Sequence, residues 1–194
     1  MVLGLSGTYC SGKSEVGQRL IARYGFSEID VDQIGHEALR RKTEEIVATF
    51  GGAVRSDTGG INRTALGRIV FADATRMAQL ESLVHPVMVD MVREQVKRCS
   101  SERILINAAL LVHMGLDSLC DAVIRVDAPV SVRVWRARWR DDLDLGDILA
   151  RIKRQRGLKF SSERVDTYTM RNVGSRKRLE RKLHELALTL GIAE

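Results

Sequence analysis

Apolar residues along this chain gather in short runs that alternate with longer segments of helical periodicity. The runs at 2–5, 104–109 and 122–127 are short and mostly apolar, which is typical of buried strands. The segments at 15–24 and 130–140 repeat apolar positions every three or four residues, which predicts amphipathic helices. Strands that alternate with helices predict an α/β fold, a mostly parallel sheet flanked by helices and joined by right-handed crossovers.

The same periodicities predict elements elsewhere. A second strand is expected at 26–32 and one long helical stretch at 33–50. Helix is expected again from 62 to about 98, where Pro86 interrupts or starts a helix. The remaining predicted elements are a helix around Ile148 and Ile152, a weak strand at 168–170 and a C-terminal helix at 176–190.

Residues 33–98 read as helix without an intervening strand. They are expected to form a helical insertion, whereas 1–32 and 99–194 form the core, with a charged lid at about 141–157. Ligands of open α/β sheets bind at the carboxyl ends of the strands. An insertion that overhangs this edge is therefore the expected site for a ligand, such as an acceptor substrate.

The first strand runs straight into GTYCSGKS at 7–14, which fits the phosphate-loop pattern G-x-x-x-x-G-K-[ST]. Backbone N–H groups of such a loop form a concave nest for phosphates, and its lysine contacts the β- and γ-phosphates. Its last hydroxyl, Ser14 here, is the expected ligand of Mg²⁺. The expected nucleotide-binding residues of the loop are Thr8, Cys10, Ser11, Gly12, Lys13, Ser14 and Glu15.

Composition limits the class of protein. The 194 residues, 44% hydrophobic, suit a globular domain, and the longest apolar run, 108–112, is far too short to cross a bilayer. The chain opens on the nucleotide strand without a signal-peptide pattern, so a cytoplasmic location is expected. The 3 cysteines lack C-x-x-C spacing, which argues against a disulfide framework and a zinc site. Loop N–H groups are expected to lower the pKa of Cys10.

The net charge of +6 suits nucleic acid, an anionic membrane or a polyphosphate substrate. Most of the basic residues are arginines, whose planar guanidinium grips phosphate bidentately, and this favours a phosphoryl-transfer enzyme. Trp135 and Trp139 are four residues apart, which predicts that they pack inward rather than stack on bases. We therefore expect no nucleic-acid or membrane partner, and a monomer or weak homo-oligomer.

Motifs along nearly the whole chain resemble those of the dephospho-CoA kinase family. Besides the phosphate loop they are IDVD at 29–32 followed by IGHE at 34–37, NRTALGRIVF at 62–71, LVHP at 83–86 and NVGS at 172–175. That family transfers the γ-phosphoryl group of ATP to the ribose 3′-hydroxyl of dephospho-CoA, the last step of coenzyme A biosynthesis. The resemblance thus implies ATP and dephospho-CoA as substrates and Mg²⁺ as the cofactor.

The resemblance also implies roles for residues at the acceptor side. A carboxylate at the end of the second strand can orient the acceptor hydroxyl and take its proton, and we prefer Asp32 to Asp30 for this role. Either aspartate could instead cap the following helix. His85 matches a position near the acceptor, but a histidine at a helix start serves equally often as a cap or a packing residue.

Arg136 and Arg140, in the helix just before the lid, are four residues apart and share a helix face. The resemblance implies that Arg140 neutralises charge on the transferring phosphoryl group and that Arg136 contacts ATP. Arg151 and Gln155 form a second such pair.

The resemblance assigns Asn172 and Gly174 to a loop that contacts adenine. The spacing between residues 166 and 172 is one longer than usual there, so the register of this loop stays open.

The chain departs from the family at the end of the third strand. Where the family commonly has D-x-P-L-L-F-E, residues 107–113 read NAALLVH, so Asn107, Ala109 and His113 replace the usual residues. If a carboxylate at position 107 helps to hold Mg²⁺ through water, an amide weakens that hold. Leu110 and Leu111 remain and are expected to form an apolar wall for the substrate.

Other classes of protein compete with this interpretation. A related kinase of a nucleoside, nucleotide or other small metabolite would share the core and the lid. A regulatory GTPase would share the phosphate loop, and DTGG at 57–60 satisfies D-x-x-G, but the sequence has no N-K-x-D motif. A basic nucleic-acid-binding module is the non-enzymatic alternative, and adenine-nucleotide binding that requires Mg²⁺ would distinguish a kinase from it.

Overall fold

The computed structural model describes residues 1–141, 143–155 and 157–193. Its sheet has the strand order β2-β3-β1-β4-β5, and β1 pairs in parallel with β3 and β4, as does β4 with β5. The predicted α/β class is thus confirmed. The strands are β1 (Val2–Gly7), β2 (Ser27–Asp30), β3 (Ile104–Asn107), β4 (Ala122–Asp127) and β5 (Thr167–Arg171).

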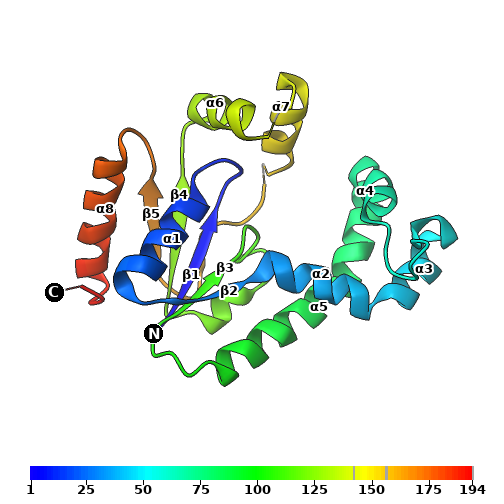
Figure 1. Cartoon of the computed structure of the whole chain (residues 1–194), viewed down its shortest axis with the longest axis horizontal. Helices are drawn as coiled ribbons and strands as arrows, with labels where there is room; N and C mark the ends of the chain where they lie inside the picture. The colour runs from blue at the N-terminus through cyan, green and yellow to red at the C-terminus, as the bar shows by residue number, and fades with distance from the viewer. Residues whose placement is uncertain (142, 156, 194) are drawn as a thin grey trace. The chain divides into compact units, whose positions relative to one another are not determined.

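Helices connect these strands and fill the long segment between β2 and β3 (Figure 1). The helices are α1 (Lys13–Tyr24), α2 (Val31–Arg41), α3 (Thr43–Phe50), α4 (Arg63–Ala72), α5 (Ala74–Arg98), α6 (Val130–Arg140), α7 (Leu145–Arg154) and α8 (Arg176–Thr189), with 3₁₀ turns η1 (Gly52–Val54) and η2 (Leu116–Leu119). Within the described residues, none of these helices has both the length and the apolar character needed to cross a bilayer.

The chain forms two compact units. The core unit comprises Met1–Ile29 and Cys99–Glu194, and the helical unit comprises Asp30–Arg98. The boundary therefore runs through the end of β2 and the end of α5.

The core unit is built around β1 and β4, whose side chains are buried on both faces of the sheet. Leu3, Leu5 and Ile124 have no exposed surface, as expected for central strands of a parallel sheet. Helices α1 and α8 pack against this sheet and contribute Leu20 and Leu183 to the same apolar cluster (Figure 1). Burial of such aliphatic side chains, at about 1.5–3 kcal/mol each, supplies most of the driving force for this packing.

The helical unit differs from the sequence prediction in two places. The predicted helix at 33–50 is two helices, because the Thr43 hydroxyl donates to the carbonyl of Arg40 at 2.8 Å and the chain turns at Lys42. Pro86 lies inside α5, which continues past it, so it neither interrupts nor starts a helix.

The second strand is shorter than predicted. It ends at Asp30, whose carboxylate accepts hydrogen bonds from the N–H groups of Asp32 at 2.9 Å and Gln33 at 3.3 Å. These bonds make Asp30 the N-cap of α2 and place Asp32 in its first turn. The prediction of a strand through Asp32 was therefore wrong by two residues.

Helix α6 spans the predicted residues but turns a different face inward. Trp135 and Trp139 are 63% and 79% exposed, whereas Arg133 and Ala137 are buried. The prediction that the tryptophans pack inward was wrong. Arg133 can lie on the buried face because its guanidinium donates hydrogen bonds to acceptors there.

Candidate active site

The phosphate loop connects β1 to α1 with two residues in the left-handed region, Cys10 at φ 57° and Gly12 at φ 92°. Ser11 N–H donates to the carbonyl of Thr8 at 3.0 Å, which closes the turn between them. Gly12 is required for space as well as for its backbone angle, because a Cβ there would lie 2.1 Å from Nδ2 of Asn172. The loop therefore folds back sharply before α1, as an anion-binding nest requires.

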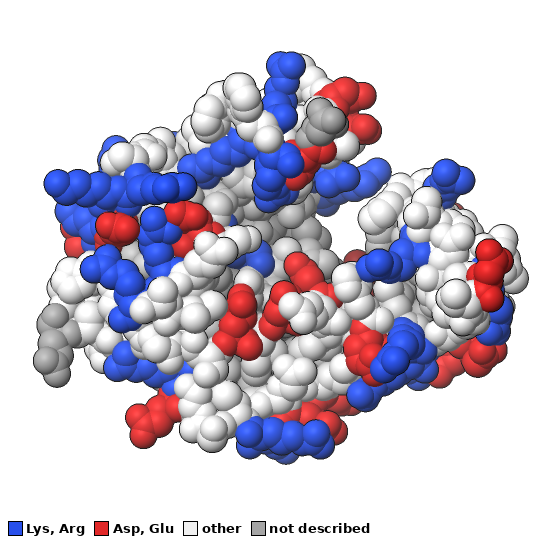
Figure 2. All heavy atoms as spheres, in the orientation of Figure 1, with Lys and Arg blue, Asp and Glu red and all other residues white. Residues whose placement is uncertain are grey.

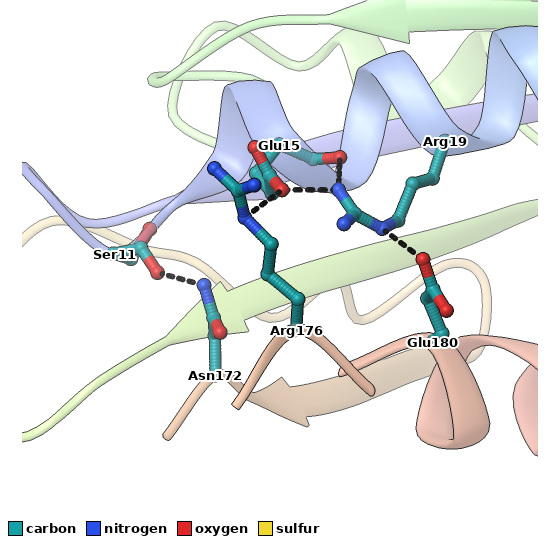
Figure 3. Close-up of polar contacts among 6 residues, drawn as sticks. All are labelled: Ser11, Glu15, Arg19, Asn172, Arg176 and Glu180. Atoms are coloured by element: carbon teal, nitrogen blue, oxygen red, sulfur yellow. Dashed lines mark hydrogen bonds and ion pairs between the residues drawn. The ribbon is translucent and has the colours of Figure 1, made fainter. Parts of the chain in front are cut away.

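The side chains of Arg136 and Asn172 both donate hydrogen bonds to the phosphate loop. The carbonyl of Ser11 accepts from Nδ2 of Asn172 at 2.9 Å (Figure 3). It also accepts from Nη1 of Arg136 at 2.8 Å. Arg136 also donates to the carbonyl of Asn172 at 3.2 Å, and Asn172 is buried. These two predicted ATP-binding residues thus meet at the phosphate loop. Gly174 follows at φ 99° in an exposed turn before α8.

Lys13 lies at the start of α1 and reaches the end of β3. Its ammonium donates to Oδ1 of Asn107, and Nδ2 of Asn107 donates to Oε1 of Glu28 at 2.6 Å. The amide of Asn107 thus links Lys13 to a carboxylate, that of Glu28, on the neighbouring strand β2. Sequence reasoning missed Glu28. The available signal was an acidic residue in a strand that ends at the same edge of the sheet.

Tyr9 joins the loop to α6 and α7 through its backbone. Its N–H donates to Oε1 of Gln155 at 2.7 Å, and its carbonyl accepts from Nε of Arg133 at 2.7 Å. Arg133 also donates to Gln155 at 3.2 Å, which gives the buried guanidinium its partners. Burial lowers the pKa of Arg133 from its ordinary value. Neither Tyr9 nor Arg133 was predicted as a site residue. Tyr9 makes these contacts with backbone atoms, which every residue has, and a buried arginine cannot be told from an exposed one in sequence.

Two guanidinium groups lie close to the Tyr9 ring. The Cζ atoms of Arg140 and Arg151 are 5.4 Å and 5.6 Å from the ring centroid, within cation–π range. The Tyr9 hydroxyl donates to Asp141, which pairs with Arg140 at 2.6 Å and 2.9 Å. Desolvation and then this hydrogen bond raise the pKa of Tyr9 to about 12. The hydrogen bond from Arg140 is the main reason that the pKa of Asp141 falls to about 2.

Cys10 is buried in the phosphate loop. Burial raises the pKa of the Cys10 thiol, so the predicted lowering was wrong. The loop N–H groups do not outweigh the desolvation of a thiolate in the apolar cluster with Ala137, Ile148 and Ile152. In the predicted lid at 141–157, residues 142 and 156 lie outside the described residues.

Glu15 places a negative charge at the first turn of α1, beside the loop. It pairs with Arg19 one turn later and with Nε of Arg176 at 3.8 Å, while Arg19 lies 3.6 Å from Glu180 of α8 (Figure 3). These arginines offset a charge that would otherwise repel phosphate. The hydroxyl-bearing neighbour Ser14 is exposed.

Basic side chains gather over α6 and α7 and over the start of α8 (Figure 2). This arrangement gives the core unit a positive surface around elements that contact the phosphate loop, which favours an anionic ligand there. The exposed members are Arg138, Arg140, Arg151, Lys153, Arg154, Arg176, Lys177 and Arg178.

The predicted substrate residues divide between the units. Leu111 is fully buried beside Gly4 of β1, and Leu110 is half-buried. Asp32 is exposed in the first turn of α2, and His85 is half-buried in α5, both in the helical unit. Because Asp30 uses its carboxylate for the helix cap, Asp32 is the better candidate for a carboxylate that contacts substrate.

A family model described as dephospho-CoA kinase matches residues 1–176. The dephospho-CoA kinase of Bacillus licheniformis is 35% identical over 192 residues, which covers 96% of this chain and 94% of that protein. That of Borreliella burgdorferi is 37% identical over 132 residues, or 68% of this chain and 64% of that protein. These matches confirm the resemblance that the motifs indicated.

Solved structures resemble the whole fold. A crystal structure of a Thermus thermophilus protein is 30% identical, has a TM-score of 0.80 and covers 98% of this chain and 97% of that chain. Dephospho-CoA kinase from Campylobacter jejuni, at 22% identity, has a TM-score of 0.68 and covers 97% and 96% of the two chains, which indicates a shared fold.

Proposed function

The chain belongs to the dephospho-CoA kinase family, and from this premise we propose that it phosphorylates the ribose 3′-hydroxyl of dephospho-CoA with ATP. The products are coenzyme A and ADP. The observation that carries the proposal is the phosphate loop, which Arg136 and Asn172 hold between β1 and α1 with Lys13 at its end.

ATP phosphates are proposed to bind the loop N–H groups and Lys13. Phosphoryl transfer demands little covalent chemistry of a protein, so positioning and charge stabilisation account for most of the rate. Arg136 supports this loop directly. Its guanidinium reaches the Ser11 carbonyl and brings a positive charge to the loop.

Mg²⁺ is the proposed cofactor. The exposed Ser14 hydroxyl would supply one oxygen ligand, which suits an ion that usually keeps several waters and takes phosphate oxygens as further ligands. When bound, the ion would neutralise charge on the β- and γ-phosphate oxygens.

Asp32 is the proposed general base. Its carboxylate would orient the acceptor hydroxyl and take its proton as the new P–O bond forms. Asp30 is proposed to have a structural role, because it already accepts two N–H groups at the start of α2.

Arg140 is proposed to stabilise charge on the transferring phosphoryl group. Its present partner, Asp141, holds it bidentately, so a phosphoryl oxygen would compete with that carboxylate for the same N–H donors. Such competition favours the more highly charged group, which is the phosphoryl group in transfer.

The helical unit is proposed to carry the acceptor. In this unit His85 is a candidate contact for the acceptor. In the core unit, Leu110 and Leu111 are candidate acceptor contacts, and Asn172 and Gly174 are candidates for adenine binding. The cysteines are free thiols, which suits a reducing compartment such as the cytoplasm. The proposed state is a monomer or weak homo-oligomer.

The test is an acceptor panel. The protein is incubated with Mg·ATP and one acceptor at a time: dephospho-CoA, AMP, adenosine or another nucleoside. The value of kcat/KM is compared between the acceptors, and mass spectrometry identifies each product. We expect dephospho-CoA to be far the best acceptor, since contacts with its pantetheine arm help to orient the reacting hydroxyl. A clear preference for AMP or a nucleoside would move the chain to another kinase specificity.

A further inference from the structure

We propose that Glu28 is a positioning residue for Lys13 and that it acts through the side-chain amide of Asn107. This role rests on the proposed function only in that Lys13 is taken to bind ATP phosphates. It makes the carboxylate of β2 part of the phosphate-binding apparatus, although Glu28 belongs to none of the motifs found in the sequence.

The three side chains form a chain of hydrogen bonds across two strands and a helix. Lys13 of α1 donates to Oδ1 of Asn107 at the end of β3, and Nδ2 of Asn107 donates to Glu28 of β2 at 2.6 Å. The three residues lie in the core unit, and β2 and β3 are neighbours in its sheet. The chain therefore leads from a carboxylate, through an amide, to an ammonium.

The carboxylate determines which way the amide faces. An ionised carboxylate only accepts hydrogen bonds and an ammonium only donates them. Glu28 thus selects the NH₂ end of Asn107, which leaves the oxygen end for Lys13. Without Glu28, Lys13 alone would favour this orientation, and the amide would be held at one end only.

The neutral amide has a second consequence, for the charge of Lys13. A carboxylate in direct contact with the ammonium would compete with phosphate for its positive charge, because both are anions. An amide oxygen fixes the position of the ammonium without neutralising it. The negative charge of Glu28 lies beyond the amide of Asn107, so it does not contact the ammonium through this chain of hydrogen bonds.

The contact between Glu28 and Asn107 is exposed, and an exposed pair often contributes little to stability. A merely structural surface contact and a positioning role therefore predict different results. The first leaves catalysis unchanged. The second changes the KM for ATP while the KM for dephospho-CoA and the melting temperature stay near those of the wild type.

The experiment compares Glu28→Gln, Asn107→Asp and the double variant, with Glu185→Gln as a matched control. Glu185 is an exposed glutamate of α8 that pairs only loosely with Arg181 at 3.7 Å. Direct calorimetric binding of Mg·ATP accompanies the steady-state kinetics, so that Lys13 positioning is measured even if another acceptor replaces dephospho-CoA.

Glu28→Gln keeps the length of the side chain but no longer dictates the amide orientation, and we expect about a five-fold rise in the Kd and KM for ATP. Asn107→Asp sets a carboxylate against Glu28 and next to Lys13. We expect a larger rise, because repulsion by Glu28 and neutralisation of Lys13 outweigh the gain from a carboxylate that holds Mg²⁺ through water. In the double variant the amide introduced on β2 can donate to the carboxylate introduced on β3, so ATP affinity should recover by at least about three-fold relative to Asn107→Asp. It should stay weaker than in the wild type, because the introduced carboxylate neutralises Lys13.

Two results would overturn the proposal. One is a Kd for ATP in Glu28→Gln that matches the Glu185→Gln control. The other is a double variant that binds ATP no better than Asn107→Asp. If Asn107→Asp fails to fold, the comparison of Glu28→Gln with the control still decides, since both changes remove one exposed charge at constant size.

Discussion

Replacing Gly12 with alanine should damage the phosphate loop by two separable mechanisms. The residue has φ 92°, a left-handed conformation that costs an alanine about 1–2 kcal/mol. The new Cβ would also lie 2.1 Å from Nδ2 of Asn172, so this buried amide would have to move. Its bond of 2.9 Å to the Ser11 carbonyl would break, and an unsatisfied buried amide costs about 1–3 kcal/mol. The expected total is about 2–5 kcal/mol.

Chemical denaturation of four variants separates the two costs. Gly25 has φ 69° at the end of α1, and among the described residues no atom lies within 4 Å of a Cβ built there. Gly25→Ala should therefore lose only the backbone term. In an Asn172→Ala background the clash at Gly12 disappears, so Gly12→Ala should cost about 1–2 kcal/mol there. The reasoning fails if Gly12→Ala costs the same in both backgrounds, or no more than Gly25→Ala.

Three further predictions concern the charged groups. Lys13→Ala should abolish phosphoryl transfer but leave the circular dichroism spectrum unchanged, and wild-type turnover in a folded variant would exclude this loop as the catalytic nucleotide site. Asp32→Asn should lower kcat strongly at nearly constant ATP affinity, whereas Asp30→Asn, still a good N-cap, should not; equal losses would contradict the assignment. The pKa of Asp141 is lowered from 3.8 to about 2, so its ionised form stabilises the fold above pH 4 or so, and this contribution is lost as the pH falls toward 2. The difference in melting temperature between wild type and Asp141→Asn should therefore shrink over that range, and a constant difference would argue against a role for the ion pair.

The parts of the fold with strong local patterns could be predicted from sequence. The strand at 122–127 and the helix at 130–140 have the predicted bounds, because a short, mostly apolar run and a 3.6-residue period leave few alternatives. The end of the second strand was misplaced because Val31 extends its apolar pattern. The hydrogen bonds that Asp30 accepts from Asp32 and Gln33 show that the helix begins at Val31.

The buried face of α6 could not be predicted, since periodicity treats every arginine as polar. Arg133 is buried because the carbonyl of Tyr9 and the side chain of Gln155 accept its N–H groups, and both lie far away in the sequence. Glu28 was missed for a related reason. Its contact with Asn107 joins residues 79 positions apart, and no local pattern contains that information.

The exposed face of α6 has a practical consequence for experiments. The chain has 2 tryptophans, and both Trp135 and Trp139 lie on this helix with most of their surface in solvent. Intrinsic tryptophan fluorescence of the unlabelled protein is therefore an optical signal from α6 alone, with no indole in the sheet or in the helical unit. If α6 detaches before the sheet melts, emission and circular dichroism will give two different transition midpoints, and fluorescence alone will underestimate the stability of the core. Because Trp139 is next to Arg140 in the sequence, tryptophan emission can also be followed during nucleotide titrations, without a label.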